Sequence, residues 1–515
     1  MKRCPQCQKT YAGDTIRFCR HDGTPLTDEF SLESSATRPL PSLSPAADST
    51  TQELHRTASI AVLPFANISA DPENEYFCEG LAEEILNALA KIEALQVAAR
   101  TSAFSFKGRE IDAGEIGRKL NVSSVLEGSV RKAGNRLRIT AQLVNVADGF
   151  EIWSERYDRE LKDVFDIQDE ISLAIVEALR VKLLGAEKAT VFRRHTDNTE
   201  AYQLYLKGRY HYAKWHKDEW KRAIEYYEQA IAKEPDYAPA WAGIAEVQGQ
   251  LWYFGHVGPD SGARQFEIAV TRSLELDQTL PESHLGLAKL KFWYEWDWPG
   301  AEQEIKKTLV LNPNNGEAHA SYGYLFAIIG RQFDAVTEAR RALELDPLSL
   351  YIIFHVAWIF WLIGKYDLWL EQGRKLVELE PQFFGAYWIT GIERWMKGAH
   401  EEAIAEFQKA VSFSAGPLCL SYVGCLYGLT GDREKAQQVL HELQTLSAKK
   451  YVQRYCFAMV YAGLGEMDRA FEWLEKAYEQ REGVLVLLKP MPPMIPGLEA
   501  DPRWPGLLGR IGLLE

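Results

Sequence analysis

The chain reads NPNNGEAHASYGYLFAIIGRQFDAVTEARRALELDP from Asn312 to Pro347 and runs on to a third proline, Pro381. Pro313, Pro347 and Pro381 lie 34 residues apart. A period of this length is typical of repeat proteins, in which each unit is a pair of helices that buries its apolar face against its neighbours. Each proline is expected just past a helix end, where a missing N–H group costs little.

Small residues recur at fixed places between these prolines. In the quoted unit, Gly323 would let one helix approach its partner closely, and Ala335 and Ala342 would keep the second helix thin where it packs. The pattern resembles the tetratricopeptide repeat (TPR), and this resemblance implies an α-solenoid that binds protein partners. It predicts about eight units over residues 199–483. Other copies include Ala223, Tyr227, Ala230 and Pro235, and Ala301, Ile305, Thr308 and Pro313.

Residues 1–28 form a small module around closely spaced cysteines. Cys4-Pro5-Gln6-Cys7 has the spacing of one zinc-ribbon knuckle, whose turn directs two thiolates at one tetrahedral site. Cys19 begins a second knuckle, in which Asp22 stands where a second cysteine is expected and His21 is the alternative fourth ligand. The module resembles the short zinc ribbons that begin many bacterial proteins. A ribbon without metal and a redox Cys-x-x-Cys pair are the alternatives.

The next two segments differ in composition. Residues 29–57 are rich in serine and proline and lack apolar periodicity, which predicts a disordered linker. Residues 58–188 are typical of a compact α/β domain. Apolar runs and alternation predict strands at 59–65, 95–99, 124–131, 137–143 and 152–157, a hairpin turn at 133–135, and helices at 81–92, 113–120 and 167–183.

Three motifs of this domain resemble the TolB-like amino-terminal domain. They are Ile60–Phe65 (Ile-Ala-Val-Leu-Pro-Phe), Gly80–Ile85 and Leu126–Val130. In bacterial signalling proteins such a domain often stands between an output module and TPRs, so the resemblance implies a role in signalling or regulation. The predicted fold is therefore multidomain and mainly α, a TPR solenoid preceded by a small TolB-like α/β domain and a zinc-ribbon-like knuckle.

The composition is that of a globular protein with an acidic balance. Of the 515 residues, 46% are hydrophobic and 25% are charged, and the net charge is −14, which disfavours bulk binding of nucleic acid or anionic membranes. The seven cysteines do not suggest a disulfide framework, and no apolar run follows Met1 as in a signal peptide. The most apolar stretch, residues 350–363, is too short to span a bilayer. We therefore expect a cytoplasmic protein.

Motifs of catalysis are absent from the sequence. It contains no P-loop, no dinucleotide-binding glycine motif, no His-Glu-x-x-His and no Gly-x-Ser-x-Gly elbow. We therefore expect a non-enzymatic adaptor or scaffold. The alternative is a transcription-associated regulator whose zinc ribbon contacts nucleic acid or RNA polymerase, because the ribbon is locally basic at Lys2, Arg3, Lys9, Arg17 and Arg20. A third hypothesis is an enzyme hidden in the α/β domain.

Aromatic residues are concentrated in the first helices of the central units, which face the groove in the TPR family. By that resemblance, the groove carries Tyr324, Tyr351, Phe354, Trp358, Trp361, Trp388 and Trp395. The second unit has Pro239, Ala242, Glu246, Gly249 and Gln250 at the same positions. Because exposed apolar patches mark binding sites, we expect a peptide with apolar anchors to dock across residues 351–396. The alternative is that the chain itself or a second copy covers these rings.

The last segment, residues 484–515, is expected to cap the solenoid. An open repeat array needs a terminal element that covers its last apolar face and presents a polar outside. The apolar face of this element would be formed by Leu507, Leu508, Ile511 and Leu513.

We predict that Cys4, Cys7, Cys19 and Asp22 hold one structural zinc ion. The module is too short to be stabilised by an apolar core, so the metal would have to hold it together. Elemental analysis of the purified protein should give about one zinc per chain, and Cys7→Ser should remove it. A zinc content near zero after expression with ample metal would contradict the prediction.

Overall fold

We describe the protein from a computed structural model. It describes residues 2–3, 10–11, 27–28, 58–69, 71–181, 194–214, 216–253, 255–413, 416–491 and 494–513. The chain divides into two compact units, Met1–Arg56 and Thr57–Glu515. In the first unit, β1 (Lys2–Arg3) pairs antiparallel with both β2 (Thr10–Tyr11) and β3 (Thr27–Asp28). The predicted zinc ligands Cys4, Cys7, Cys19 and Asp22, and the linker of residues 29–57, lie outside the described residues.

The second unit begins with a mixed β-sheet. β4 (Ala58–Val62) pairs in parallel with β6 (Leu95–Val97) and β7 (Ser124–Ala133), and β8 (Arg136–Asn145) and β9 (Glu151–Glu160) extend the sheet antiparallel from β7. The strand order is β6-β4-β7-β8-β9, with the short β5 (Ala66–Asn67) beside β7. Gly134 has a φ of 59° at the tight turn between β7 and β8, which confirms the predicted hairpin.

Helices cover both faces of this sheet. On one face, α1 (Glu75–Ala90) and α4 (Val164–Ala178) share a buried core with the inward side chains of β7 and β8. On the other face, α2 (Arg100–Phe104) and α3 (Ala113–Leu120) enclose a smaller core. These elements agree with the expected strands and helices, while the resemblance to TolB-like domains and the domain boundaries stay predictions.

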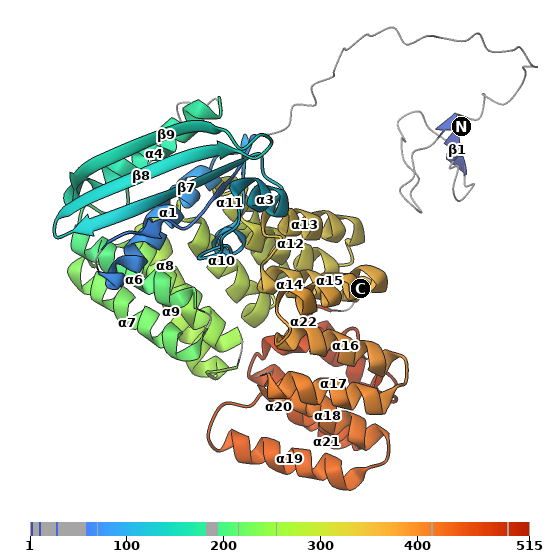
Figure 1. The fold of residues 1–515 in the computed structure, drawn as a ribbon. Coiled ribbons are helices and arrows are strands. Elements are labelled where there is room, and N and C mark those ends of the chain that lie inside the picture. Colours follow the sequence, from blue (N-terminus) through green and yellow to red (C-terminus); the bar gives the residue numbers. More distant parts are fainter. Residues whose placement is uncertain are drawn as a thin grey trace, which may run out of the picture. The chain divides into compact units, whose positions relative to one another are not determined.

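The rest of the second unit is a solenoid of TPR-type helix pairs (Figure 1). The helices α12, α14 and α16 begin 34 residues apart, and so do α13, α15 and α17. A Cβ atom on Gly323 would lie 3.1 Å from the carbonyl oxygen of Ala335, so the helices of a pair do approach closely there. The pairs are α6 (Thr199–Tyr212) with α7 (Lys217–Lys233), α8 (Ala238–Tyr253) with α9 (Pro259–Leu276), α10 (Pro281–Leu290) with α11 (Trp298–Leu311), α12 (Gly316–Ile328) with α13 (Gln332–Leu345), α14 (Leu350–Leu362) with α15 (Tyr366–Leu379), α16 (Phe384–Met396) with α17 (His400–Ser412), α18 (Gly416–Leu429) with α19 (Arg433–Ser447), and α20 (Arg454–Gly463) with α21 (Met467–Glu479).

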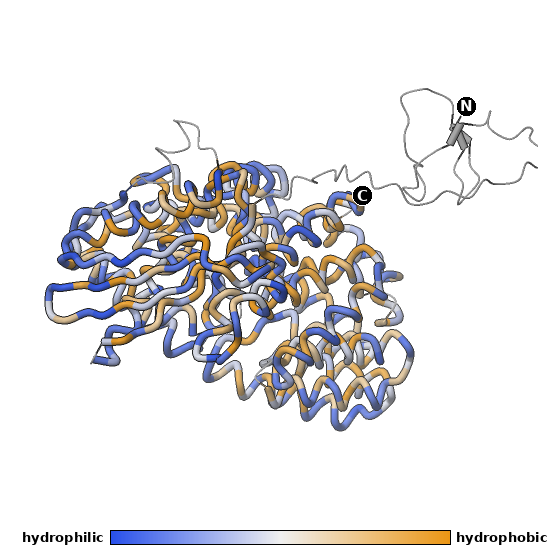
Figure 2. The backbone as a smooth tube through the Cα atoms, turned by 45° about the horizontal axis from the view of Figure 1, so that its top comes forward, coloured by the Kyte–Doolittle hydropathy of each residue, from blue (hydrophilic) through white to orange (hydrophobic). Residues whose placement is uncertain are grey.

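Orange and blue stretches follow one another along many of these helices in Figure 2, so apolar and polar residues are mixed within them, whereas α14 is apolar almost throughout. The apolar side of each second helix carries the small residues predicted from the repeat, and Ala335, Ala339 and Ala342 are completely buried in α13. The third pair departs from the pattern. Between α10 and α11 the chain forms a π-helical turn, η3 (Lys291–Glu295), and Trp296 adopts a positive φ of 56°.

The C-terminal segment folds back onto the solenoid. It consists of the 3-10 helix η4 (Gly483–Leu488), an irregular stretch and α22 (Arg503–Ile511). Its predicted apolar face is buried, because Leu507, Leu508, Ile511 and Leu513 are all at most 7% exposed. Arg503 pairs with Asp468 at 3.0 Å and thereby ties α22 to α21.

We expect removal of this apolar face to destabilise the protein. Leu507→Ala would leave a cavity at a fully buried side chain, which costs about 2–5 kcal/mol of the free energy of unfolding. The neighbouring Gly506→Ala is a matched control, since its Cβ would meet no atom within 4 Å. Urea unfolding followed by circular dichroism measures both changes. Equal stability of the two variants would show that α22 does not cap the solenoid.

Candidate functional site

The aromatic groove predicted from the sequence is closed in the structure. Trp358, Trp361, Trp388 and Trp395 are only 5%, 3%, 2% and 3% exposed. Tyr324 is also buried, while Tyr351 and Phe354 are half-buried. The expectation that these rings are accessible to a peptide was therefore wrong.

Contacts within the solenoid cover these rings. The ring centroids of Trp358 and Trp388 lie 3.9 Å apart, and Trp395 meets Tyr422 of the following first helix at 5.8 Å. The first helices of successive units thus pack ring against ring. Leu485 and Met491 of the C-terminal segment belong to the same buried cluster.

The C-terminal segment also joins the end of the solenoid to its third unit. Trp298 Nε1 donates a hydrogen bond to the carbonyl of Gly512 at 3.1 Å, and Trp296 stacks on Tyr478 at 5.3 Å. A Cβ atom on Gly483 would come within 2.9 Å of the carbonyl oxygen of Trp293, so only a glycine fits there without a shift. These contacts close the interior of the later repeats to a partner.

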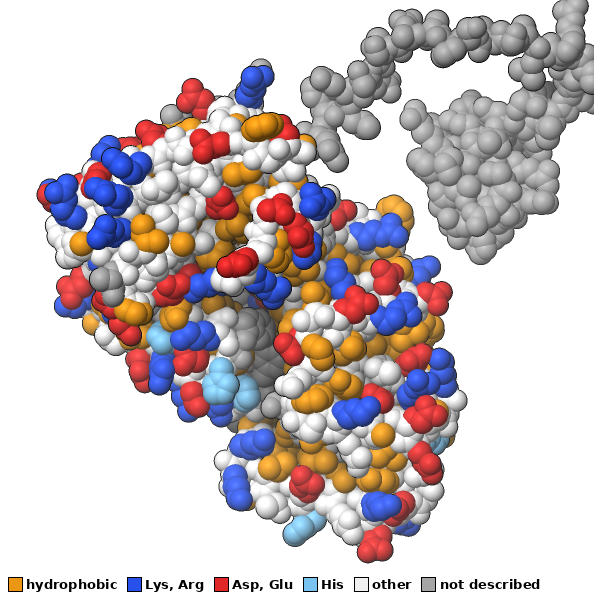
Figure 3. Space-filling view, viewed as in Figure 1, with side chains coloured by type: hydrophobic (Ala, Val, Ile, Leu, Met, Phe, Trp, Pro, Cys, Tyr) orange, Lys and Arg blue, Asp and Glu red, His pale blue; other side chains and the backbone are white. Residues whose placement is uncertain are grey.

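Two adjoining cavities lie beside the earlier repeats instead. The wider one, called here the junction cavity, has a volume of about 110 Å³ and lies where α1 and α4 of the α/β part meet α6, α8 and α10. The narrower one, called the extension, has a volume of about 40 Å³ and follows the first helices α8, α10, α12 and α14. Both are lined by Glu246 and Glu282, so the two cavities adjoin each other. On the face seen in Figure 3, the surface is hollowed between the early repeats and α14 to α16.

Buried ion pairs hold the elements around the junction cavity. The guanidinium of Arg209 on α6 donates to the carboxylate of Glu83 on α1 at 2.7 and 2.9 Å, and to Glu246 on α8. Arg100 donates to the other oxygen of Glu83 at 2.8 Å. Burial alone would raise the pKa of Glu83, but the two guanidinium groups outweigh it and hold that pKa below its ordinary value. Glu83 is therefore a charged group at the centre of the junction.

Glu84, the next residue on α1, faces the junction cavity. Burial and the neighbouring charge of Glu83 raise the pKa of Glu84 to about 7. Burial also raises the pKa of Glu246. The cavity thus holds carboxyl groups whose charged form is disfavoured in the absence of a bound cation.

The extension is lined by a second polar group. Lys289 donates to Glu317 at 2.6 Å. Near it, His355 Nδ1 donates to the carbonyl of Tyr351 at 2.9 Å, and its Nε2 lies 3.2 Å from the hydroxyl of Tyr253. Burial lowers the pKa of His355 to about 4, so this imidazole is neutral near pH 7 and accepts a hydrogen bond at Nε2. The extension and its immediate surroundings therefore contain charged, aromatic and hydrogen-bonding side chains.

No group of three or more His, Cys, Asp or Glu side chains in the described part of the chain has the geometry of a metal site. Among the described helices, none is long and apolar enough to cross a bilayer.

Comparison with known proteins gives two similar sequences. A protein of Rhizobium meliloti (strain 1021) named "Putative adenylate cyclase 3" is 36% identical over 243 residues, which are 47% of this chain and 41% of that protein. A TPR repeat-containing protein of Methanocaldococcus jannaschii is 40% identical over 58 residues, which are 11% of this chain and 17% of that protein. This chain spans less than half the length of either relative. No family model matches it.

A solved structure similar to this chain is that of a thermophilic TPR protein of Thermus thermophilus. The match covers 35% of this chain and 92% of that protein, at 17% identity and a TM-score of 0.30. Together with the 34-residue helix pairs, the TPR relative identifies this part of the chain as a TPR-type solenoid.

Most of the lining of the two cavities comes from units outside the predicted groove, although the predicted groove residue Tyr351 lines the extension. Ala242, Glu246 and Gly249 of the second unit line the two cavities, although they were set aside as less aromatic than the central units. A usable signal was present in the sequence, because Glu246, Glu282 and Glu317 are charged residues near the middle or start of otherwise apolar first helices. Such residues seldom lie inside a fold without a partner.

We expect Arg209→Met to destabilise the protein strongly. The change would leave Glu246 without its partner and Glu83 with Arg100 alone, a loss of about 3–5 kcal/mol in the free energy of unfolding. Arg222→Met is the control, because Arg222 is 60% exposed and forms a surface ion pair, which contributes about 0–1 kcal/mol. Chemical denaturation measures both. If Arg209→Met were no worse than the control, these ion pairs would not hold the junction.

Proposed function

We propose that the chain is a non-enzymatic interaction protein that receives a segment of a protein partner at the junction cavity and its extension. The observation that carries the proposal is a pair of adjoining cavities along the first helices of five successive repeats, from α6 to α14. Their lining combines carboxylates, two lysines, two arginines and several tyrosines, which can select a partner by charge and shape. Pockets of this kind, where domains meet, are preferred places for binding.

We propose that this binding role serves bacterial signalling. The relative named as an adenylate cyclase supports it, since about half of this chain matches part of a protein whose name places it in nucleotide signalling. That activity belongs to the relative, and we propose for this chain the binding role rather than the chemistry. The resemblance of residues 58–188 to TolB-like domains favours the same setting.

We also propose that the protein works in the cytoplasm. In the described part of the chain, Cys78, Cys419, Cys425 and Cys456 are free and buried thiols. Burial raises the pKa of each of these thiols, so they are protonated and unreactive at neutral pH. Free cysteines of this kind are typical of a reducing compartment.

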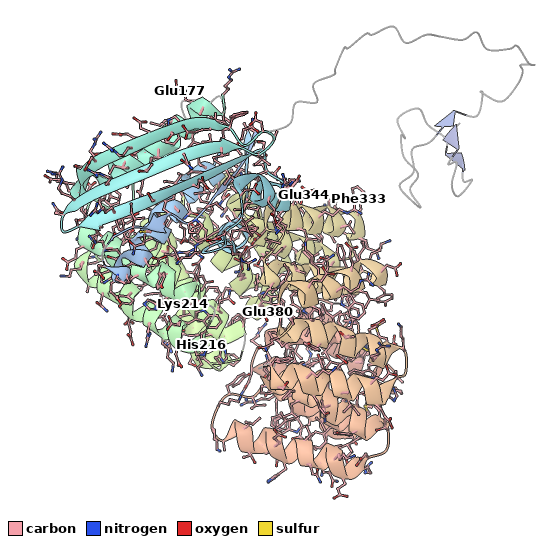
Figure 4. All side chains as sticks on the ribbon, in the orientation of Figure 1. Glu177, Lys214, His216, Phe333, Glu344 and Glu380 are labelled. Atoms are coloured by element: carbon pink, nitrogen blue, oxygen red, sulfur yellow. The ribbon has the colours of Figure 1, made fainter. Side chains whose placement is uncertain are left out.

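Site-specific photocrosslinking tests the binding role. A benzoylphenylalanine in place of Asn87 would stand in the site, whereas the same residue in place of Phe333, which is 81% exposed and is labelled on α13 in Figure 4, would stand outside it. In the native organism, one partner should crosslink from position 87 and not from position 333. Mass spectrometry then locates the crosslink on the partner. A partner that crosslinks only from position 333 would contradict the proposed site.

A further inference from the structure

The junction cavity is built by two parts of the chain. Glu84 and Lys91 reach it from α1, Ser172 reaches it from α4, and the first three repeats supply the remaining walls. Three tyrosines, Tyr202, Tyr205 and Tyr237, stand around it. A group bound here would therefore contact the α/β part and the solenoid at the same time.

Negative charge exceeds positive charge around the cavity. Four carboxylates line it, on Glu84, Asp169, Glu246 and Glu282, against three cations, on Lys91, Arg194 and Arg209. Two of these cations are already held by carboxylates. Arg194 pairs with Asp166 and with Asp169, and Arg209 pairs with Glu83 and with Glu246. Among the described residues that line the cavity, only the lysine ammonium of Lys91 then stands against Glu84 and Glu282.

A buried hydroxyl in the cavity wall is a second, independent observation. Ser172 is 1% exposed, and its Oγ has no hydrogen-bond partner among the described residues. A buried polar group without a partner is costly, and each such group in a native protein calls for an explanation. A ligand that donates several hydrogen bonds would satisfy Ser172 Oγ together with the two carboxylates.

We infer that the junction cavity binds an alkylammonium or guanidinium group. Such a group offers three to five N–H donors and a positive charge, which match the carboxylates of Glu84 and Glu282 and the oxygen of Ser172. The faces of the tyrosine rings attract cations as well. The volume of about 110 Å³ is several times the roughly 10–15 Å³ that one water molecule needs on the same measure, so a short-chain amine or the end of one basic side chain fits.

The alkylammonium or guanidinium group could come from either of two sources. One is a free amine, and the other is a lysine or arginine side chain of the partner segment, in which case the inference rests on the proposed function. A segment that lies along the extension could place such a side chain in the junction cavity, because both share Glu246 and Glu282. Separate ligands distinguish the two sources.

Titration calorimetry with the full chain provides the test. The probes are n-butylamine and agmatine, with n-butanol as the neutral control. The amines should bind and n-butanol should not. Replacing Glu282 by Gln, or Glu84 by Gln, should weaken amine binding about tenfold or more, because each removes a hydrogen bond to a charged group. Glu267→Gln, at an exposed position on α9, should bind the amines as the unchanged protein does.

The pH dependence of binding gives a further readout. The groups that face Glu84 are Glu83 and Lys91 on α1, Arg209 on α6, Glu282 on α10, and the tyrosines Tyr202, Tyr205 and Tyr237. Because the pKa of Glu84 is about 7, amine affinity should rise as the pH increases to about 7 and level off above it. In Glu84→Gln this rise should disappear.

A comparison of two peptides distinguishes the two sources of the bound group. A peptide with one central lysine is compared with the same peptide carrying norleucine. Tighter binding of the lysine peptide than of n-butylamine favours a partner side chain, and the reverse favours a free amine. If neither amine nor lysine peptide binds, or if Glu282→Gln and Glu267→Gln bind equally, the inference is overturned. The crosslinking result at position 87 is independent of this outcome, because the inference gives Asn87 no role in binding the cation.

Discussion

Arg209 is held between carboxylates from different parts of the chain, Glu83 of the α/β part and Glu246 of the second repeat. Loss of Arg209 would leave Glu246 without its partner and would take from Glu83 one of its two guanidinium partners, and breaking buried ion pairs in this way is costly. The ion pairs therefore determine how α1 lies across α6 and α8. Because Glu84 follows Glu83 on the same helix, placing Glu83 against Arg209 also brings Glu84 to the junction cavity. The candidate site is thus a consequence of how the two parts are joined.

The turns that contain the repeat prolines form a second connection between the α/β part and the solenoid. β6 is an edge strand, and the unpaired polar groups of an edge strand need partners or cover. The side chain of Asn314 provides them, donating to the carbonyls of Ala90 and Leu95 at 3.0 and 2.8 Å and accepting from the N–H of Val97. At the equivalent turn of the next unit, the carboxylate of Asp346 accepts from Ser102 N at 3.1 Å. Turns that end the repeat helices therefore also hold the sheet.

The later repeats are closed by the chain itself. Trp293 and Trp298 contact the C-terminal segment and Trp296 contacts Tyr478 of α21, and these contacts bring the third unit and the end of the solenoid together. The aromatic first helices of the central units consequently serve as core, since ring contacts of this kind stabilise a buried cluster. The two cavities lie mainly beside the first helices of the earlier units, which carry more polar residues.

Much of the fold could be predicted from the sequence, because local rules determine it. The period of Pro313, Pro347 and Pro381 and the small residues between them follow from helix geometry, and the strands and the turn at Gly134 follow from alternation and backbone freedom. The site could not be predicted in the same way. Whether a first helix faces open space or another part of the chain depends on contacts between residues far apart, such as Asn314 and Leu95, which are separated by 219 positions. An amphipathic pattern marks the side of a helix that is buried, but only the tertiary structure decides what buries it.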